Sequence, residues 1–504
     1  MDYIVKRPML LAAFISSLAA ALGFYSKNAV FIIGVAIISF FFVALYKKLN
    51  GGLIVAIVMA FAVVISSFLQ LAEINEIKYN DGTVCKGEFI VISEPVSKGD
   101  YYSTTLEVKK SDALKNGSKI DAIYYEDGIS FADVIVADVS LKSMEESNYR
   151  INYYSEKIYL SGYIKNAEKT NQKDFALKYI GSLREYIKQR IFKNYEFSEA
   201  ATILALITGD KGYFTDDFYN NVKSAGVAHV MVVSGMHLSI IVSFLLFFTK
   251  KLFYNRFFKA LVIFIAVIVV VCVCGFTMSI IRAGITYILI VISLILNKPN
   301  TPSNTLGTAV TLILINNPLA VLNMVFQLTV LSTFGILVVA LPCIEFAERK
   351  ELIKNKILFW VLSTSLISIS ATVLTAPALI YYFGYLSNVA LITNLLICTP
   401  AEIALCLAIL GLLIVPFERV FFFVSGIIIK YINAVINYFG TLEFSITVLP
   451  RWTAFLAAVF VIILLFGLLA CKKRINMLKL KEIHNKKIKE GGKKVKWQLF
   501  TKKN

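Results

Sequence analysis

Long apolar runs constrain this chain more than any other feature of its sequence. A helix that crosses a bilayer needs about 20 predominantly apolar residues. Of the 504 residues, 58% are hydrophobic and only 17% are charged, which is too little polar surface for a soluble body of this size. We therefore predict a polytopic α-helical membrane protein with about 10–12 transmembrane helices. The plainest apolar runs are residues 10–24, 29–44, 53–69, 240–248, 261–273, 285–296, 358–379 and 455–470.

The distribution of Lys and Arg predicts how these helices are oriented, because short cytoplasmic loops are enriched in both residues. Lys6 and Arg7 precede the first apolar run, and the tail 472–504 holds 13 Lys/Arg against 2 Asp/Glu. We expect a multi-pass protein with cytoplasmic N- and C-termini and with residues 71–165 outside the cytoplasm. The basic tail is interpreted as an anchor on an anionic membrane surface, so the lipid bilayer is the first expected partner.

A polar segment interrupts the apolar sequence and has the pattern of a β domain. Short β-branched or aromatic runs alternate with turn residues, which favours about five strands in a small extracytoplasmic β-barrel of the OB type. A plain β-sandwich is the alternative. The expected strands cover residues 87–92, 102–109, 120–125, 134–141 and 158–164. The predicted division is 1–70 for three N-terminal transmembrane helices, 71–168 for the OB-like domain, 169–471 for a membrane channel domain and 472–504 for the tail.

The sequence lacks the motifs that indicate several kinds of chemistry. The chain has no Gly-x-x-x-x-Gly-Lys-Ser/Thr loop, so ATP binding of that kind is not expected. Its three histidines are too few and too scattered for a His-rich two-metal site. Cys85 is the only cysteine in the polar segment, which therefore holds no disulfide of its own. We expect no cofactor and no metal.

The densest polar group within apolar sequence is residues 228–237, shortly after Asp210 and Lys211. Polar side chains at membrane depth usually face a cavity or another helix. Ser234 and His237 are three residues apart and would be neighbours on a helix. One interpretation is a close helix crossing made by Ser234 and Gly235, with His229 and His237 hydrogen-bonded across it. An intramembrane serine hydrolase is a second, but nucleophile and base usually come from separate elements, and no Gly-x-Ser-x-Gly elbow is present.

Three further polar residues stand in apolar surroundings. Arg282 is either a snorkelling arginine at a helix end or a guanidinium that faces the bundle and meets an anion such as phosphate. Gln327 and Asn394 are isolated among apolar residues, and such interruptions indicate an aqueous route through the helices.

These motifs, taken in order, resemble the competence domain of the ComEC-type family of DNA-uptake channels. The resemblance runs from about residue 185 to 470 and is carried by Gly209-Asp210-Lys211, Ala225-Gly226, His229, Ser234-Gly235-Met236-His237, Arg282-Ala283, Phe326-Gln327-Leu328 and the segment from Asn394 to Pro400. It implies a channel in the bacterial cytoplasmic membrane for uptake of single-stranded DNA during natural transformation, and not an enzyme. The residues expected along the DNA path are Asp210, Lys211, His229, Ser234, Gly235, His237, Arg282, Gln327 and Asn394.

Two departures from that family shape the expected partners. Many members carry a further β-lactamase-like metal domain, for which this sequence has no motif, so a separate nuclease is expected beside a DNA receptor and a cytoplasmic motor. Residues 71–165 hold 11 Lys/Arg against 16 Asp/Glu, a balance that gives no support to DNA binding there. A small-molecule transporter is the remaining alternative function. The oligomeric state is open, and a homo-oligomer is one option.

Overall fold

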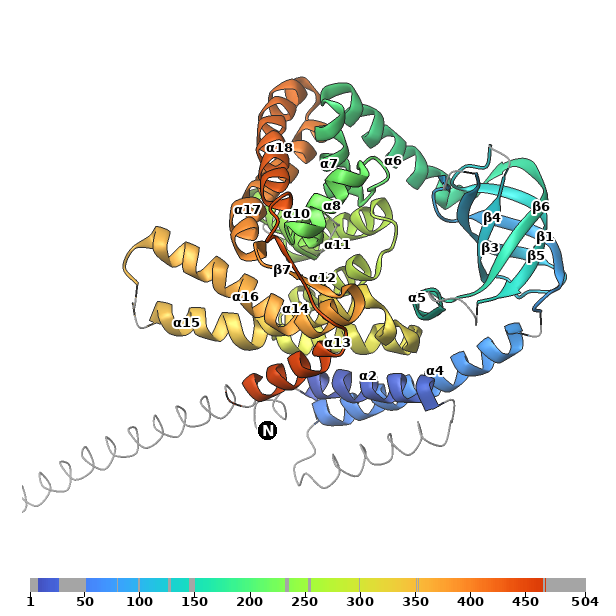
Figure 1. Ribbon diagram of the computed structural model, residues 1–504, viewed down its shortest axis with the longest axis horizontal. Coiled ribbons are helices and arrows are strands. Elements are labelled where there is room, and N and C mark those ends of the chain that lie inside the picture. Colours follow the sequence, from blue (N-terminus) through green and yellow to red (C-terminus); the bar gives the residue numbers. More distant parts are fainter. Residues whose placement is uncertain are drawn as a thin grey trace, which may run out of the picture.

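The computed structural model describes residues 8–26, 51–78, 80–97, 100–125, 128–144, 150–231, 235–252, 255–298, 300–349, 351, 353–465 and 467. Most of them are helical, and one sheet stands beside the helical body (Figure 1).

The sheet contains the strands that the alternating sequence pattern predicts. In β4 every second residue is buried, which is the period of a strand with one face on a core. Side chains that are fully buried between the strands include Phe89, Leu106, Ile120 and Leu160. All five predicted strands are present, together with one two-residue strand. The bounds are β1 Val84–Val91, β2 Val96–Ser97, β3 Tyr102–Ser111, β4 Lys119–Tyr124, β5 Asp133–Ser143 and β6 Ile158–Lys173.

The pairings of these strands form a mixed sheet. Strand β1 is antiparallel to both β5 and β3, β3 is antiparallel to β4, and β5 is antiparallel to β6. The pair β4–β6 is parallel. Each of the five long strands therefore has a partner on both sides, which leaves no long unpaired edge among them.

The helical body contains thirteen labelled helices after the sheet, within the residues that the structure describes. Before the sheet lie α2 Pro8–Ser26 and α4 Gly51–Lys78, and α5 Arg150–Ser155 lies between β5 and β6. The later helices are α6 Phe175–Asn194, α7 Phe197–Thr208, α8 Asp216–Ser224, α9 Ala228–Met231, α10 Gly235–Leu252, α11 Arg256–Val273, α12 Met278–Leu296, α13 Pro302–Asn316, α14 Met324–Gly335, α15 Leu341–Arg349, α16 Lys356–Phe383, α17 Ala390–Leu413 and α18 Glu418–Gly440. Short pieces are η1 Pro318–Leu322, η2 Ile336–Ala340, η3 Val415–Phe417, β7 Tyr385–Ser387 and β8 Ile446–Val448.

Seven of the described helical segments are long and apolar enough to cross a membrane. They are Ile57–Ile77, Arg256–Val273, Met278–Leu296, Met324–Glu348, Lys356–Phe383, Ala390–Leu413 and Val415–Gly440. Four shorter apolar helices accompany them, at Pro8–Ala21, Phe197–Thr208, Gly235–Leu245 and Thr453–Leu465. The count of 10–12 spans stays a prediction, since the second apolar run, residues 29–44, and the end of the chain lie outside the described residues.

A buried polar network joins the first helices, the sheet domain and the helical body. The Gln70 amide on α4 donates to the Tyr159 hydroxyl on β6 at 2.8 Å and to Asn317 Oδ1 at 2.9 Å. Asn317 in turn donates to the Ser155 carbonyl on α5 at 2.6 Å, and Asn323 Nδ2 donates to Ser155 Oγ at 2.9 Å. Buried polar groups that satisfy one another in this way hold elements in one arrangement.

Helix α6 makes the second connection between the sheet and the helical body (Figure 1). Arg184 Nη1 is 3.1 Å from the Oε1 atom of Glu94, a residue that follows β1 in the chain. The same guanidinium lies over the Phe131 ring. Further along α6, Arg190 forms an ion pair with Glu418 at the start of α18. The sheet domain is thus held to the helices at two separated places.

Candidate functional site

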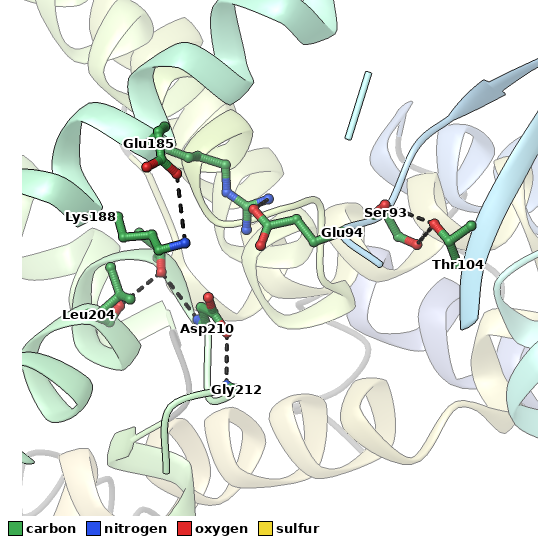
Figure 2. Close-up of polar contacts among 10 residues, drawn as sticks. Ser93, Glu94, Thr104, Glu185, Lys188, Leu204, Asp210 and Gly212 are labelled. Atoms are coloured by element: carbon green, nitrogen blue, oxygen red, sulfur yellow. Dashed lines mark hydrogen bonds and ion pairs between the residues drawn. The ribbon is translucent and has the colours of Figure 1, made fainter. Parts of the chain in front are cut away.

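The polar loop after α7 is organised by its own side chains. Helix α7 ends at Gly209, whose φ of +82° is a left-handed conformation that favours glycine. Asp210 Oδ1 then accepts a hydrogen bond from the Gly212 backbone N–H at 2.8 Å (Figure 2). This turn fixes Asp210 within the loop and leaves the next residue, Lys211, to extend toward α8.

Two lysines, one in this loop and one on α8, lie close to the same tyrosine ring. The Lys223 ammonium lies 4.1 Å from the centre of the Tyr219 ring, and the Lys211 ammonium lies 6.0 Å from it. Both lysines are half-buried, and neither forms an ion pair among the described residues. Burial lowers the pKa of Lys211, and the neighbouring charge of Lys223 lowers it further. We call Lys211, Tyr219 and Lys223 the lysine pair site.

The end of α8 is fastened to the start of α17. Ser387 Oγ donates to the Ser224 carbonyl at 2.7 Å, and Thr393 Oγ1 donates to the Ala225 carbonyl at 2.6 Å. Gly226 has a φ of +74°, and a Cβ there would lie only 2.6 Å from the Ala390 Cβ. Glycine is required at this position both for its backbone conformation and for the close approach.

The two predicted path histidines occupy different surroundings. His229 on α9 is an exposed residue, although the protein packed around it lowers its pKa through burial, and a hydrogen bond to the Gly226 backbone opposes that shift. His237 on α10 is only 2% exposed and lies near enough to His229 to interact electrostatically. Ser234 lies outside the described residues.

Gly235 and Arg282 are brought into contact although 47 positions separate them. A Cβ on Gly235 would be 3.0 Å from Arg282 Nη2 and 3.4 Å from the Ala283 Cβ. Arg282 is 8% exposed. A snorkelling arginine keeps its charged end in water, whereas this guanidinium is buried between α10 and α12. Gly235 therefore lies at a contact between α10 and α12, and the side chain that it meets there is the arginine. The crossing with two hydrogen-bonded histidines stays a prediction.

Gln327 and Asn394 each share a hydrogen bond with a side chain of α16. Gln327 Nε2 donates to the Val321 carbonyl at 2.9 Å, and its Oε1 accepts from the Tyr382 hydroxyl at 3.2 Å, so it ties α14 to α16. Asn394 Nδ2 donates to Ser368 Oγ at 3.0 Å, while its buried Oδ1 has no partner among the described residues. Their place on a DNA path stays a prediction.

The described residues of the predicted path thus fall into two groups, while Gln327 and Asn394 are bonded to α16. Asp210 and Lys211 belong to the loop at the lysine pair site, and His229, Gly235, His237 and Arg282 surround the start of α10. The pairing of Lys223 with Tyr219 was not foreseen from the sequence. The spacing of four residues between them was a usable signal, because side chains at i and i+4 meet on a helix.

Comparison with known proteins places the chain in a family. The family model described as "Competence: Competence protein" matches residues 206–474, which is more than half of the chain. The chain belongs to the competence protein family. The matched segment includes all nine residues that the sequence assigned to a DNA path.

A relative is known from Bacillus subtilis (strain 168), where it is called ComE operon protein 3. The two sequences are 20% identical over 456 residues, which is 87% of this chain and 57% of the relative. The chain therefore spans a little more than half the length of that protein. No solved structure matches this chain.

Proposed function

We propose that this competence-family chain is a channel in the bacterial cytoplasmic membrane that passes single-stranded DNA during natural transformation. Family membership supports a role in competence and DNA uptake. The seven described helices long enough to span a bilayer support a multi-pass membrane protein. In this proposal both termini are cytoplasmic and the sheet domain is outside, as the distribution of Lys and Arg indicates.

The lysine pair site is the observation that carries the proposal. Two half-buried ammonium groups without a carboxylate partner repel each other, and such an arrangement is costly unless an anion joins it. Single-stranded DNA provides phosphates for the cations and bases for the aromatic ring. Because contacts to the phosphate backbone do not depend on base sequence, the site suits a channel that accepts any DNA.

The sheet domain completes the proposed path on the outside. We propose that its five mutually paired strands form the OB-type barrel, since the pairings return from β3 to β1 and include one parallel pair, β4–β6. Tyr125 and Tyr163 are 58% and 42% exposed, and Tyr125 makes edge contacts with both Tyr101 and Tyr163. Exposed rings of this kind stack with bases regardless of sequence.

The chain is proposed to act without catalysis of its own. A DNA receptor, a cytoplasmic motor and a nuclease would be separate proteins, and the hydrolase and small-molecule transporter alternatives gain no specific observation from the structure.

Uptake of labelled DNA tests the proposal. The assay uses transformable cells that depend on this chain, and compares the parent with the double variant Lys211→Gln/Lys223→Gln at equal membrane abundance. Loss of two charge-assisted phosphate contacts is expected to lower uptake about tenfold or more. The matched control is Lys354→Gln/Lys356→Gln, which removes two exposed lysines near the start of α16 and should leave uptake unchanged. Equal uptake by both double variants would refute the proposal.

A further inference from the structure

Arg282 is a buried cation without a counter-ion. Its side chain is 8% exposed, its Nε has no hydrogen-bond partner, and it forms no ion pair among the described residues. The three residues that precede α10, Val232-Val233-Ser234, contain no carboxylate. A guanidinium does not lose its charge in a protein, and a buried charge is normally paired. An anion is therefore the group that would pair with this charge.

The guanidinium is directed at the N-terminal end of α10. Arg282 Nη2 lies 3.0 Å from the position of a Gly235 Cβ, and Gly235 is the first residue of this 18-residue helix. Leu238 and Val242 of α10 pack in one apolar cluster with Ala283, which holds the first turns of α10 against this part of α12. The backbone N–H groups of a first helical turn have no partners within the helix.

Two positive features thus face each other. The N-terminus of a helix carries a partial positive charge, so a bare arginine beside it is repelled. The same arrangement attracts an anion, because N–H groups and guanidinium all donate hydrogen bonds. One helical turn earlier, Ser279 is 3% exposed and its Oγ also has no partner among the described residues. Ser279 and Arg282 share a face of α12 through their three-residue spacing.

We propose that Arg282, the first backbone N–H groups of α10 and Ser279 form a binding site for one phosphate group. The guanidinium fork matches the oxygens of a phosphate. The absence of a side chain at Gly235 leaves the guanidinium free to reach the helix end. This inference rests on the proposed function for the source of the phosphate, which is the backbone of the DNA strand in transit.

Purified protein in phosphate-free detergent micelles tests the site with inorganic phosphate as the probe. A ligand that binds the native state raises the unfolding temperature in a concentration-dependent way. Phosphate is expected to stabilise the parent more than chloride at the same ionic strength. Arg282→Gln should weaken phosphate binding between about tenfold and about a hundredfold, and Arg282→Lys should weaken it less. Arg256→Gln, which removes an exposed arginine at the start of α11, is the matched control.

Gly235→Ala provides a second variant that keeps the arginine. Its Cβ would crowd Arg282 Nη2, so phosphate binding should weaken even though no charge is lost. If phosphate stabilises the parent no better than chloride, or stabilises Arg282→Gln and the parent equally, the inference is wrong.

Two further measurements identify the source of the phosphate. The same measurement is made with an oligothymidylate, and in nanodiscs of phosphatidylglycerol against phosphatidylcholine. Arg282→Gln should reduce stabilisation by the oligothymidylate. If it removes only the stabilisation by phosphatidylglycerol, the site holds a lipid headgroup and the assignment to DNA is overturned. If phosphate binding does not depend on Arg282 but DNA uptake still falls in Lys211→Gln/Lys223→Gln, this inference is wrong and the proposed function stands.

Discussion

Replacing Gln70 by leucine should loosen the sheet domain from the helices with a measurable loss of stability. Gln70 is 5% exposed and makes three hydrogen bonds: to the Tyr159 hydroxyl at 2.8 Å, to Asn317 Oδ1 at 2.9 Å, and from the Leu319 N–H at 3.3 Å. Leucine has a similar volume but satisfies none of these groups. A buried group left without a partner costs about 1–3 kcal/mol, whereas interhelical hydrogen bonds in membranes average about 0.6 kcal/mol. With two good bonds and one long one, Gln70→Leu should cost about 2–4 kcal/mol.

The measurement is the free energy of unfolding of purified protein in mixed micelles. Ser67→Ala is the control, because Ser67 is equally buried on α4 but its hydroxyl bonds only to the Val63 carbonyl of the same helix. That control should change stability by less than about 0.5 kcal/mol. If Gln70→Leu is no less stable than Ser67→Ala, the network does not join the domains and the reasoning from its hydrogen bonds fails.

Three other predictions follow from particular residues. Gly226→Ala should destabilise the protein by about 2–4 kcal/mol in the same assay, because its φ of +74° and its close contact with α17 both exclude a Cβ; a neutral effect would contradict the packing. The pH profile of Lys211 acylation should have a midpoint below 10.5, and the midpoint should move upward in Lys223→Gln because the charge of Lys223, which lowers the pKa, is then gone. An unchanged midpoint would show that the two lysines do not interact. In cells with a cysteine-free background, an impermeant maleimide should label Lys142→Cys and not Lys356→Cys, both exposed positions, and the reverse result would invert the proposed orientation.

Local patterns in the sequence predicted local structure well. The strands follow from alternation of buried and exposed residues, a period that depends only on neighbouring positions. Helix α6 has apolar residues at helical spacing, namely Ala176, Ile180, Leu183, Ile187 and Ile191, although only Ile187 and Ile191 of these are buried. Apolar length likewise predicts helices able to span a membrane, without stating how many do so.

Such patterns did not predict contacts between residues that are far apart in the sequence. Nothing in the sequence indicates that Gly235 contacts Arg282, or that Gln70 meets Tyr159 and Asn317, because each contact depends on how separate helices pack. Cys85 illustrates the same limit: its place in a polar segment left its exposure open, and it is fully buried in the core of the sheet domain.

Crosslinking of the incoming strand at the lysine pair site tests the central claim most directly. A photoreactive phenylalanine analogue replaces Tyr219, or Phe423 as control, whose side chain is 70% exposed on α18. Cells take up labelled DNA and are irradiated during uptake, and the protein is then recovered under denaturing conditions. The account predicts covalent attachment of single-stranded DNA at position 219 and none at position 423. Equal labelling at both positions, or none at 219 while uptake proceeds, would contradict a DNA path beside Lys211 and Lys223.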